Sequence, residues 1–223
     1  MHERITVIIK PNYGMKKPNI FWDMDGVIYP SVPVSDCLNG EASPCCVPGY
    51  YLNRTPIHAV SDCITKLRIH DTCSNYIISH GYACNETVFE KAKAEKEQCL
   101  KQHKIGISEK LRGGEDDPLR LICVPQSNSF IGSKAEAAIR FLKRPLTPYD
   151  VLIDDFNTNL EDWKEKGGTA IKYLNGENSR ESWNGRSITI TDLYTVPGPF
   201  IHILTEMKWK LESEKPRKIQ FDL

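Results

Sequence analysis

The chain has 223 residues, 40% of them hydrophobic, which allows one α/β domain with an insertion or at most two small domains. Lys and Arg together number 29, as do Asp and Glu, so no net charge recruits an extended nucleic acid or an anionic membrane. The chain has no apolar run of about 18 residues, and its N-terminus does not begin a signal peptide, so we expect a soluble, cytoplasmic protein.

Short β-branched and apolar runs predict strands, and helical periodicity between them predicts helices. The first predicted strand, residues 5–9, is expected at the edge of a sheet. Further strands are predicted over residues 19–22, 76–78, 119–124, 150–153, 169–174 and 188–190. Helices are predicted over residues 57–67, 85–103, 133–142, 158–167 and 200–211, and Phe141 and Leu142 are expected on the buried side of the third.

Two segments lie outside this alternating pattern. Residues 29–49 contain several prolines and no periodicity, so we interpret them as a small loop-type cap, with an inert surface loop as the alternative. Residues 191–223 form a C-terminal extension that either packs on the body or joins a second subunit in a homodimer. The rest is predicted to be a single α/β domain, a Rossmann-like parallel sheet with flanking helices and right-handed crossovers.

The eight cysteines are scattered and form no Cys-x-x-Cys pair, so free thiols in a reducing compartment account for them best. Cys37, Cys45 and Cys46 lie close together within the proline-rich insertion. Zinc binding there is the alternative, although adjacent cysteines do not match the usual ligand spacing of a zinc finger.

Three of the predicted strands end in polar residues: Asp23 and Asp25, then Ser79 and His80, then Asp154 and Asp155. In open parallel sheets, ligands bind beyond the carboxyl ends of the strands. If the three strands are neighbours, these side chains face one another. The alternative for the first pair is an Asp-Gly turn with both carboxylates in solvent.

The carboxylates of this group suit a hard cation, and Mg²⁺ prefers oxygen ligands. We expect Asp23 and Asp154 to bind it directly and Asp155 to hold a metal-bound water. A carboxylate beside Mg²⁺ can attack phosphorus, because the metal reduces the repulsion between two anions. Asp25 is placed to carry the proton that the leaving oxygen needs.

A transferring phosphoryl group also needs hydrogen-bond donors around its oxygens. Ser79 and Lys134, the latter in the first turn of a helix that begins with a capping box at Ser133, can supply them. His80 either contacts the phosphorylated substrate or packs at the loop. A solvated lysine is the alternative for Lys134.

Four short motifs occur in an order that resembles the haloacid dehalogenase-like hydrolases. They are Asp-Met-Asp-Gly at 23–26, Ile-Ile-Ser at 77–79, Gly-Ser-Lys-Ala at 132–135 and Leu-Ile-Asp-Asp at 152–155. Within that superfamily the chain is most similar to the 5'(3')-deoxyribonucleotidase group. The likeness covers roughly residues 19–175, but the insertion is too short for the helical cap that the group often carries.

The resemblance implies a role for each motif residue. Asp23 would be the nucleophile of an aspartyl-phosphate reaction and Asp25 the general acid and base, while Ser79 and Lys134 would bind phosphate. Mg²⁺ would be held by Asp23, the Asp25 backbone carbonyl and Asp154, with Asp155 in support.

The sequence therefore predicts a Mg²⁺-dependent phosphomonoesterase that acts on a small phosphorylated substrate. The substrate that we expect is a nucleoside monophosphate. Another phosphorylated metabolite, or a nucleic-acid phosphate end, is the alternative substrate. Phosphotransfer to an acceptor other than water would use the same residues. A non-catalytic phosphate- or nucleotide-binding module is disfavoured, because every residue that the reaction needs is present.

Overall fold

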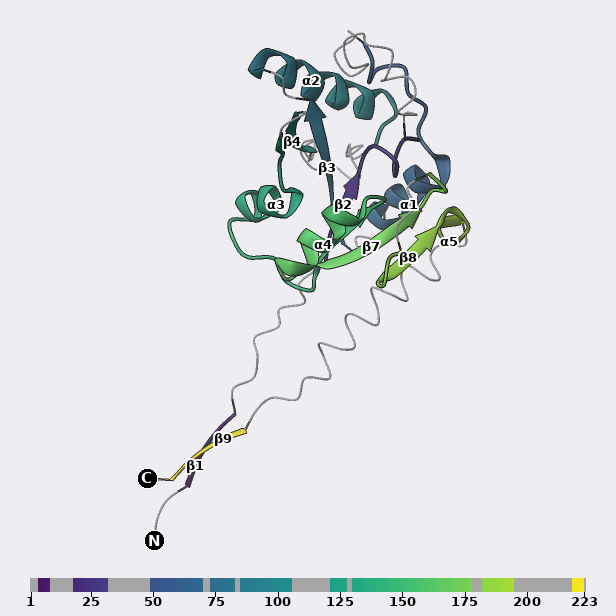
Figure 1. The fold of residues 1–223 in the computed structure, drawn as a ribbon. Helices are drawn as coiled ribbons and strands as arrows, with labels where there is room; N and C mark the ends of the chain where they lie inside the picture. Colours follow the sequence, from purple (N-terminus) through teal and green to yellow (C-terminus); the bar gives the residue numbers. More distant parts are fainter. Residues whose placement is uncertain are drawn as a thin grey trace, which may run out of the picture.

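The computed structural model describes residues 4–8, 18–31, 49–69, 73–82, 85–105, 121–127, 130–177, 182–194 and 218–222. A seven-stranded sheet with the order β5-β4-β3-β2-β6-β7-β8 forms its centre (Figure 1). Its strands are β2 (Asn19–Asp23), β3 (Ser74–Tyr82), β4 (Leu121–Ser127), β5 (Phe130–Ile131), β6 (Asp150–Asp154), β7 (Thr169–Leu174) and β8 (Arg186–Thr189).

All neighbouring strands of this sheet run parallel except β5, which pairs antiparallel with β4. From β2 the chain moves outward through β3 and β4, and then returns to the other side of β2 at β6. The strand order therefore reverses between β2 and β6, and such a reversal is where open α/β sheets bind their ligands. The predicted α/β fold is confirmed.

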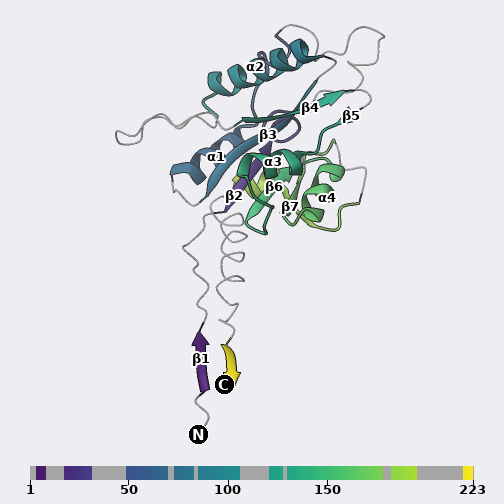
Figure 2. The same cartoon turned by 90° about the vertical axis from the view of Figure 1, so that its left-hand side faces the viewer.

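Helices cover both faces of the sheet (Figures 1 and 2). They are α1 (His58–Ile69), α2 (Glu86–Gln102), α3 (Lys134–Leu142), α4 (Asn157–Glu165) and α5 (Ile190–Tyr194). One apolar core lies between the sheet and α1, α2 and α5, and the other lies between the sheet and α3 and α4.

The central strand β2 contributes side chains to both cores, because side chains alternate between the two faces of a strand. Ile20 and Trp22 belong to the core beneath α1, whereas Phe21 packs in the core beneath α3 and α4, and all three are fully buried. A strand that is buried on both faces cannot shift without disturbing both cores. Asp23, which follows Trp22, therefore has a fixed position.

Side-chain caps set the starts of two predicted helices. The Asn85 carboxamide oxygen accepts from the backbone N–H of Val88 at 2.9 Å, and the Ser133 hydroxyl accepts from that of Glu136 at 2.9 Å. These bonds satisfy backbone donors that a helix start leaves unpaired. The cap at Ser133 makes Lys134 the first residue of α3.

Several predictions about the elements were wrong. The first strand, β1 (Arg4–Ile8), does not join the main sheet but pairs antiparallel with β9 (Lys218–Asp222), which we did not predict. Both views show this pair apart from the larger sheet, with the two ends of the chain side by side (Figures 1 and 2). Pairing between segments so distant in sequence leaves no local pattern by which to predict it.

Other errors concern strand ends and single side chains. Strand β3 continues through Tyr82, so that Ser79 lies within it, because β4 pairs with that extension as far as Gln126. The short elements β5 and α5 were not predicted. Phe141 is 47% exposed rather than buried, and its ring lies edge-on to Tyr76.

Some predictions fall outside the described residues, namely most of the insertion with Cys37, Cys45 and Cys46, and the helix over residues 200–211. Cys63 and Cys99 are buried free thiols, as expected. Among the described helices none is both long and apolar enough to cross a membrane.

An ion pair between the buried Asp150, at the start of β6, and the partly exposed Arg144 gives a test of the fold. Asp150 is fully buried, and its two oxygens accept from the Arg144 guanidinium at 2.7 and 2.8 Å. Asp150→Asn should lower the free energy of unfolding by about 2 kcal/mol in urea titrations, because the amide removes the charge and leaves donors of Arg144 and Thr147 without a matching acceptor. Glu90→Gln, which breaks an exposed pair with Lys93, is the control and should cost less than about 0.5 kcal/mol. Equal losses would contradict this reading of Asp150.

Candidate active site

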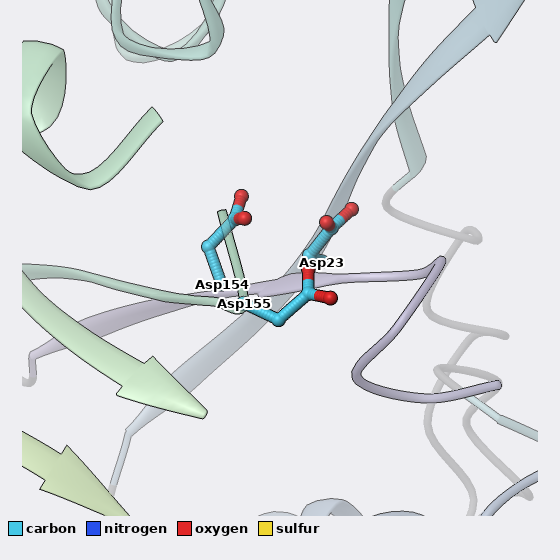
Figure 3. A group of neighbouring side chains, drawn as sticks. All are labelled: Asp23, Asp154 and Asp155. Carbon is cyan, nitrogen blue, oxygen red and sulfur yellow. The ribbon is translucent and has the colours of Figure 1, made fainter. Parts of the chain in front are cut away.

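Three carboxylates meet where the strand order reverses. Strand β2 pairs with β6 in a register that places Trp22 opposite Ile153, so Asp23 and Asp154 follow side by side. One carboxylate oxygen each from Asp23, Asp154 and Asp155 lies within 4.8 Å of the other two, and all three residues are buried (Figure 3). The predicted convergence of these strand ends is therefore found in the structure.

Lys134 is the cation nearest this cluster. Its ammonium lies 2.7 Å from Asp23 Oδ1 and 2.7 Å from Asp154 Oδ2, and the side chain is 1% exposed. Burial alone would lower the pKa of Lys134, but Asp154 and then Asp23 raise it above its ordinary value. Lys134 is therefore a permanent positive charge between two of the carboxylates.

One lysine does not neutralise three buried carboxylates. Burial, and then the charge of Asp154, raise the pKa of Asp23 well above its ordinary value, and Lys134 opposes this only in part. A site with this charge and with oxygen ligands alone fits a hard divalent cation. Asp23, Asp154 and Asp155 are the described residues that can hold one.

Hydrogen bonds fix the direction of each carboxylate. Asp154 Oδ1 accepts from the backbone N–H of Phe156 at 2.8 Å, and its Oδ2 accepts from the Asn159 amide at 3.0 Å. Asp155 Oδ2 accepts from the Asn175 amide at 2.7 Å. Partners of this kind orient ligands around a metal and raise its affinity.

Gly26 allows the loop after β2 to lie close to the Asp155 carboxylate. Its φ of +87° disfavours any other residue, and a Cβ there would lie 2.2 Å from Asp155 Oδ2. The Gly26 carbonyl also accepts from the Asn175 amide at 3.0 Å. Asn175 thus joins the loop after β2 to Asp155.

Asp25 lies in a second, adjoining group of side chains. Its Oδ2 accepts from the Ser79 hydroxyl at 3.1 Å and from the Lys96 ammonium, and its Oδ1 accepts from the Arg54 guanidinium. Burial alone would raise the pKa of Asp25, but Lys96 and then Arg54 hold it well below its ordinary value. In this arrangement Asp25 is an ionised carboxylate with both oxygens engaged.

We did not predict from the sequence that Arg54 and Lys96 would contact Asp25. Lys96 does carry a signal, since it lies at helical spacing from Ala92, Cys99 and Leu100, the other buried residues of α2. A lysine within an apolar stripe indicates a buried charge that needs a partner. For Arg54 we find no comparable signal in its neighbours along the chain.

His80 takes a different place from the phosphate-binding one that we considered. Its Nε2 lies 2.9 Å from the carbonyl oxygen of Gly132, just before the cap of α3, so that this nitrogen carries the proton and donates. Burial and then the charge of Lys134 lower the pKa of His80 to about 4. This geometry favours the packing role for His80, while the phosphate-binding roles of Ser79 and Lys134 stay predictions.

Comparison with known proteins places the fold. The chain is similar to a D,D-heptose 1,7-bisphosphate phosphatase from B. bronchiseptica, solved with magnesium and phosphate, at a TM-score of 0.52 and 13% identity, covering 86% of this chain and 99% of the other. A hydrolase from Pseudomonas syringae also matches, at a TM-score of 0.48 and 13% identity over 85% of this chain and 98% of the other. No protein-family model matches the sequence, and no curated protein does. The likeness to the first of these structures shows a haloacid dehalogenase-like α/β fold.

Gly26 provides a test of the carboxylate geometry. We expect Gly26→Ala to displace Asp155 and weaken Mg²⁺ binding by about 10-fold or more in calorimetric titrations. Gly49→Ala is the matched control, because Gly49 has a similar φ of +81° but nothing within 4 Å of an added Cβ. Both variants carry backbone strain, so equal Mg²⁺ affinities would contradict the assigned role of Gly26.

His80 provides a pH-dependent test. Its pKa falls from 6.5 to about 4 on folding, so the unfolded chain takes up the proton first as the pH drops. Stability should therefore be lost between about pH 6.5 and pH 4, by about 3 kcal/mol. His80→Gln keeps an N–H donor for Gly132 without this titration, so its unfolding free energy should fall less over the same range. An equal fall in unfolding free energy with pH in the wild type and in His80→Gln would refute the lowered pKa of His80.

Proposed function

We propose that the protein is a Mg²⁺-dependent phosphomonoesterase that forms an aspartyl-phosphate on Asp23. The observation that carries the proposal is the buried cluster of Asp23, Asp154 and Asp155 with Lys134 between two of them. A structural role alone would not explain three carboxylates gathered at the point where α/β sheets bind ligands. The haloacid dehalogenase-like fold and the order of the four motifs support the same reaction.

Asp23, Asp154 and the Asp25 backbone carbonyl would hold Mg²⁺, with Asp155 in support. When bound, the ion reduces the repulsion between the Asp23 carboxylate and a phosphate dianion. The hydrogen bonds from the backbone N–H of Met24 and from Lys134 both reach Asp23 Oδ1. Oδ2 is then the oxygen that attacks phosphorus, while Lys134 and Ser79 donate to the phosphoryl oxygens.

Two displacements complete the reaction. In the first, the bond between Asp23 Oδ2 and phosphorus forms, the ester P–O bond breaks, and Asp25 gives a proton to the leaving oxygen. In the second, Asp25 takes a proton from water, whose oxygen attacks the phosphorus and releases Asp23. Asp25 is ionised in this arrangement, as the second step requires. For the first step it must hold a proton, which it keeps from the previous turnover or takes from solvent once one of its cationic partners moves away as substrate binds.

For the substrate we propose a nucleoside monophosphate, on the strength of the motif likeness to deoxyribonucleotidases. The matched heptose bisphosphate phosphatase indicates that sugar phosphates belong in any substrate panel. We also propose a cytoplasmic location, because scattered cysteines without a Cys-x-x-Cys pair fit a reducing compartment. We propose no extended nucleic acid as a partner, because the chain as a whole carries no net charge.

Asp23→Asn tests the nucleophile. We expect phosphate release from a panel of nucleoside monophosphates and sugar phosphates by the wild type with Mg²⁺ and none with EDTA. Asp23→Asn should reduce kcat/KM by about 10,000-fold or more, because the amide is not a nucleophile. Asp62→Asn, on the exposed face of α1, is the control and should match the wild type. No release from any substrate, or full activity in Asp23→Asn, would refute the proposal.

Asp25→Asn tests the proton carrier. The variant should still bind Mg²⁺ and inorganic phosphate, since Asp25 contributes only its backbone carbonyl to the metal. Its kcat should fall by about 100- to 1000-fold, the usual contribution of general acid–base catalysis. Steady-state kinetics and calorimetry measure the two effects separately, and an unchanged kcat would remove Asp25 from this role.

A further inference from the structure

Lys96 is a buried charge to which the proposed reaction gives no role. It lies within α2 and has no exposed surface. Its ammonium donates to Asp25 Oδ2 and, at 2.9 Å, to the Ser79 hydroxyl, and it lies 4.2 Å from the centre of the Tyr51 ring. An ammonium is costly to bury, so the contacts that hold it there must be well satisfied.

The place of Lys96 is fixed from two sides. Its helix packs on the sheet through Cys99 and Leu100, which have no exposed surface. The neighbouring Glu95 accepts from the backbone N–H groups of Gly49 at 2.8 Å and Tyr51 at 3.4 Å. Glu95 thereby holds the segment that carries the Tyr51 ring against the ammonium, so that Lys96 has little freedom to move.

Asp25 has a different setting, with 37% of its side chain exposed. Lys96 and Ser79 engage one oxygen of its carboxylate, Oδ2, while Arg54 engages the other, Oδ1. The Arg54 guanidinium also donates to the Pro30 carbonyl, at the start of the insertion. The rigid, buried Lys96 on one oxygen and Arg54, from a loop, on the other would together fix the orientation of the Asp25 carboxylate.

We propose that Lys96 is a positioning residue: from α2 it holds the Asp25 carboxylate, both directly and through the Ser79 hydroxyl, in the orientation in which Asp25 meets the phosphorylated substrate. This inference rests on the proposed function. It differs from a substrate-binding role because Asp25, Ser79 and Tyr51 surround the ammonium, which therefore acts through the first two residues. Their misorientation should affect the chemical step more than substrate binding.

Lys96→Met, which keeps the length of the side chain and removes its charge, is the main test. We expect kcat to fall by about 100-fold while KM stays within about threefold, because the acid–base residue is present but misaligned. Lys96→Gln, which retains a donor for Asp25, should lose less. Lys93→Met is the control, since Lys93 lies on the same helix, is 39% exposed and pairs only with Glu90 among the described residues.

The crystal structure of Lys96→Met supplies a readout that does not depend on turnover. We expect its Asp25 carboxylate to have lost the Ser79 hydroxyl. Retention of that contact, a kcat within about threefold of wild type, or a raised KM at unchanged kcat would each overturn the inference. If Lys96→Met fails to fold, Lys96→Gln decides, with an expected fall in kcat of about 10-fold at unchanged KM and a wild-type kcat as the result that would overturn the inference. A wild type without phosphatase activity would refute the proposed function, while the orientation of Asp25 in the variant would still test Lys96.

Discussion

Mutual repulsion among three buried carboxylates is the constraint on which the rest of this structure depends. Asp23, Asp154 and Asp155 place like charges within 4.8 Å of one another in a region that excludes water. Only a compact, fully packed sheet can hold them there, and β2, buried on both faces, supplies that rigidity at the centre. Lys134 offsets part of the charge, and the remaining negative charge suits the divalent cation that we propose there.

A second cluster of side chains, around Asp25, adjoins the three carboxylates. Ser79, Lys96 and Arg54 converge on Asp25, which lies two residues beyond Asp23, in the loop after β2. The first cluster contains the carboxylates that we propose as metal ligands and nucleophile, and the second places cations around a single carboxylate. The Arg54 guanidinium donates to both Asp25 and the Pro30 carbonyl, so it links the second cluster to the start of the proline-rich insertion.

Much of this could be predicted from the sequence because the signals are local. Apolar runs that end in Asp23 and in Asp154 marked both strands and the sheet edge where they meet, and Ser133 marked the start of the helix that presents Lys134. The pairing of β1 with β9 and the cations around Asp25 depend on contacts between distant segments, which leave no periodic trace. Lys96 was the exception, since a lysine on an apolar helical stripe is itself a signal.

The most direct measurement of the central claim is anomalous diffraction from crystals soaked in Mn²⁺, which takes the same oxygen ligands as Mg²⁺. We expect a single strong peak within bonding distance of the Asp23 and Asp154 carboxylates, lost in crystals of Asp154→Asn. A peak elsewhere, no peak in the wild type, or an undiminished peak in Asp154→Asn would contradict the assignment of this cluster as the metal site.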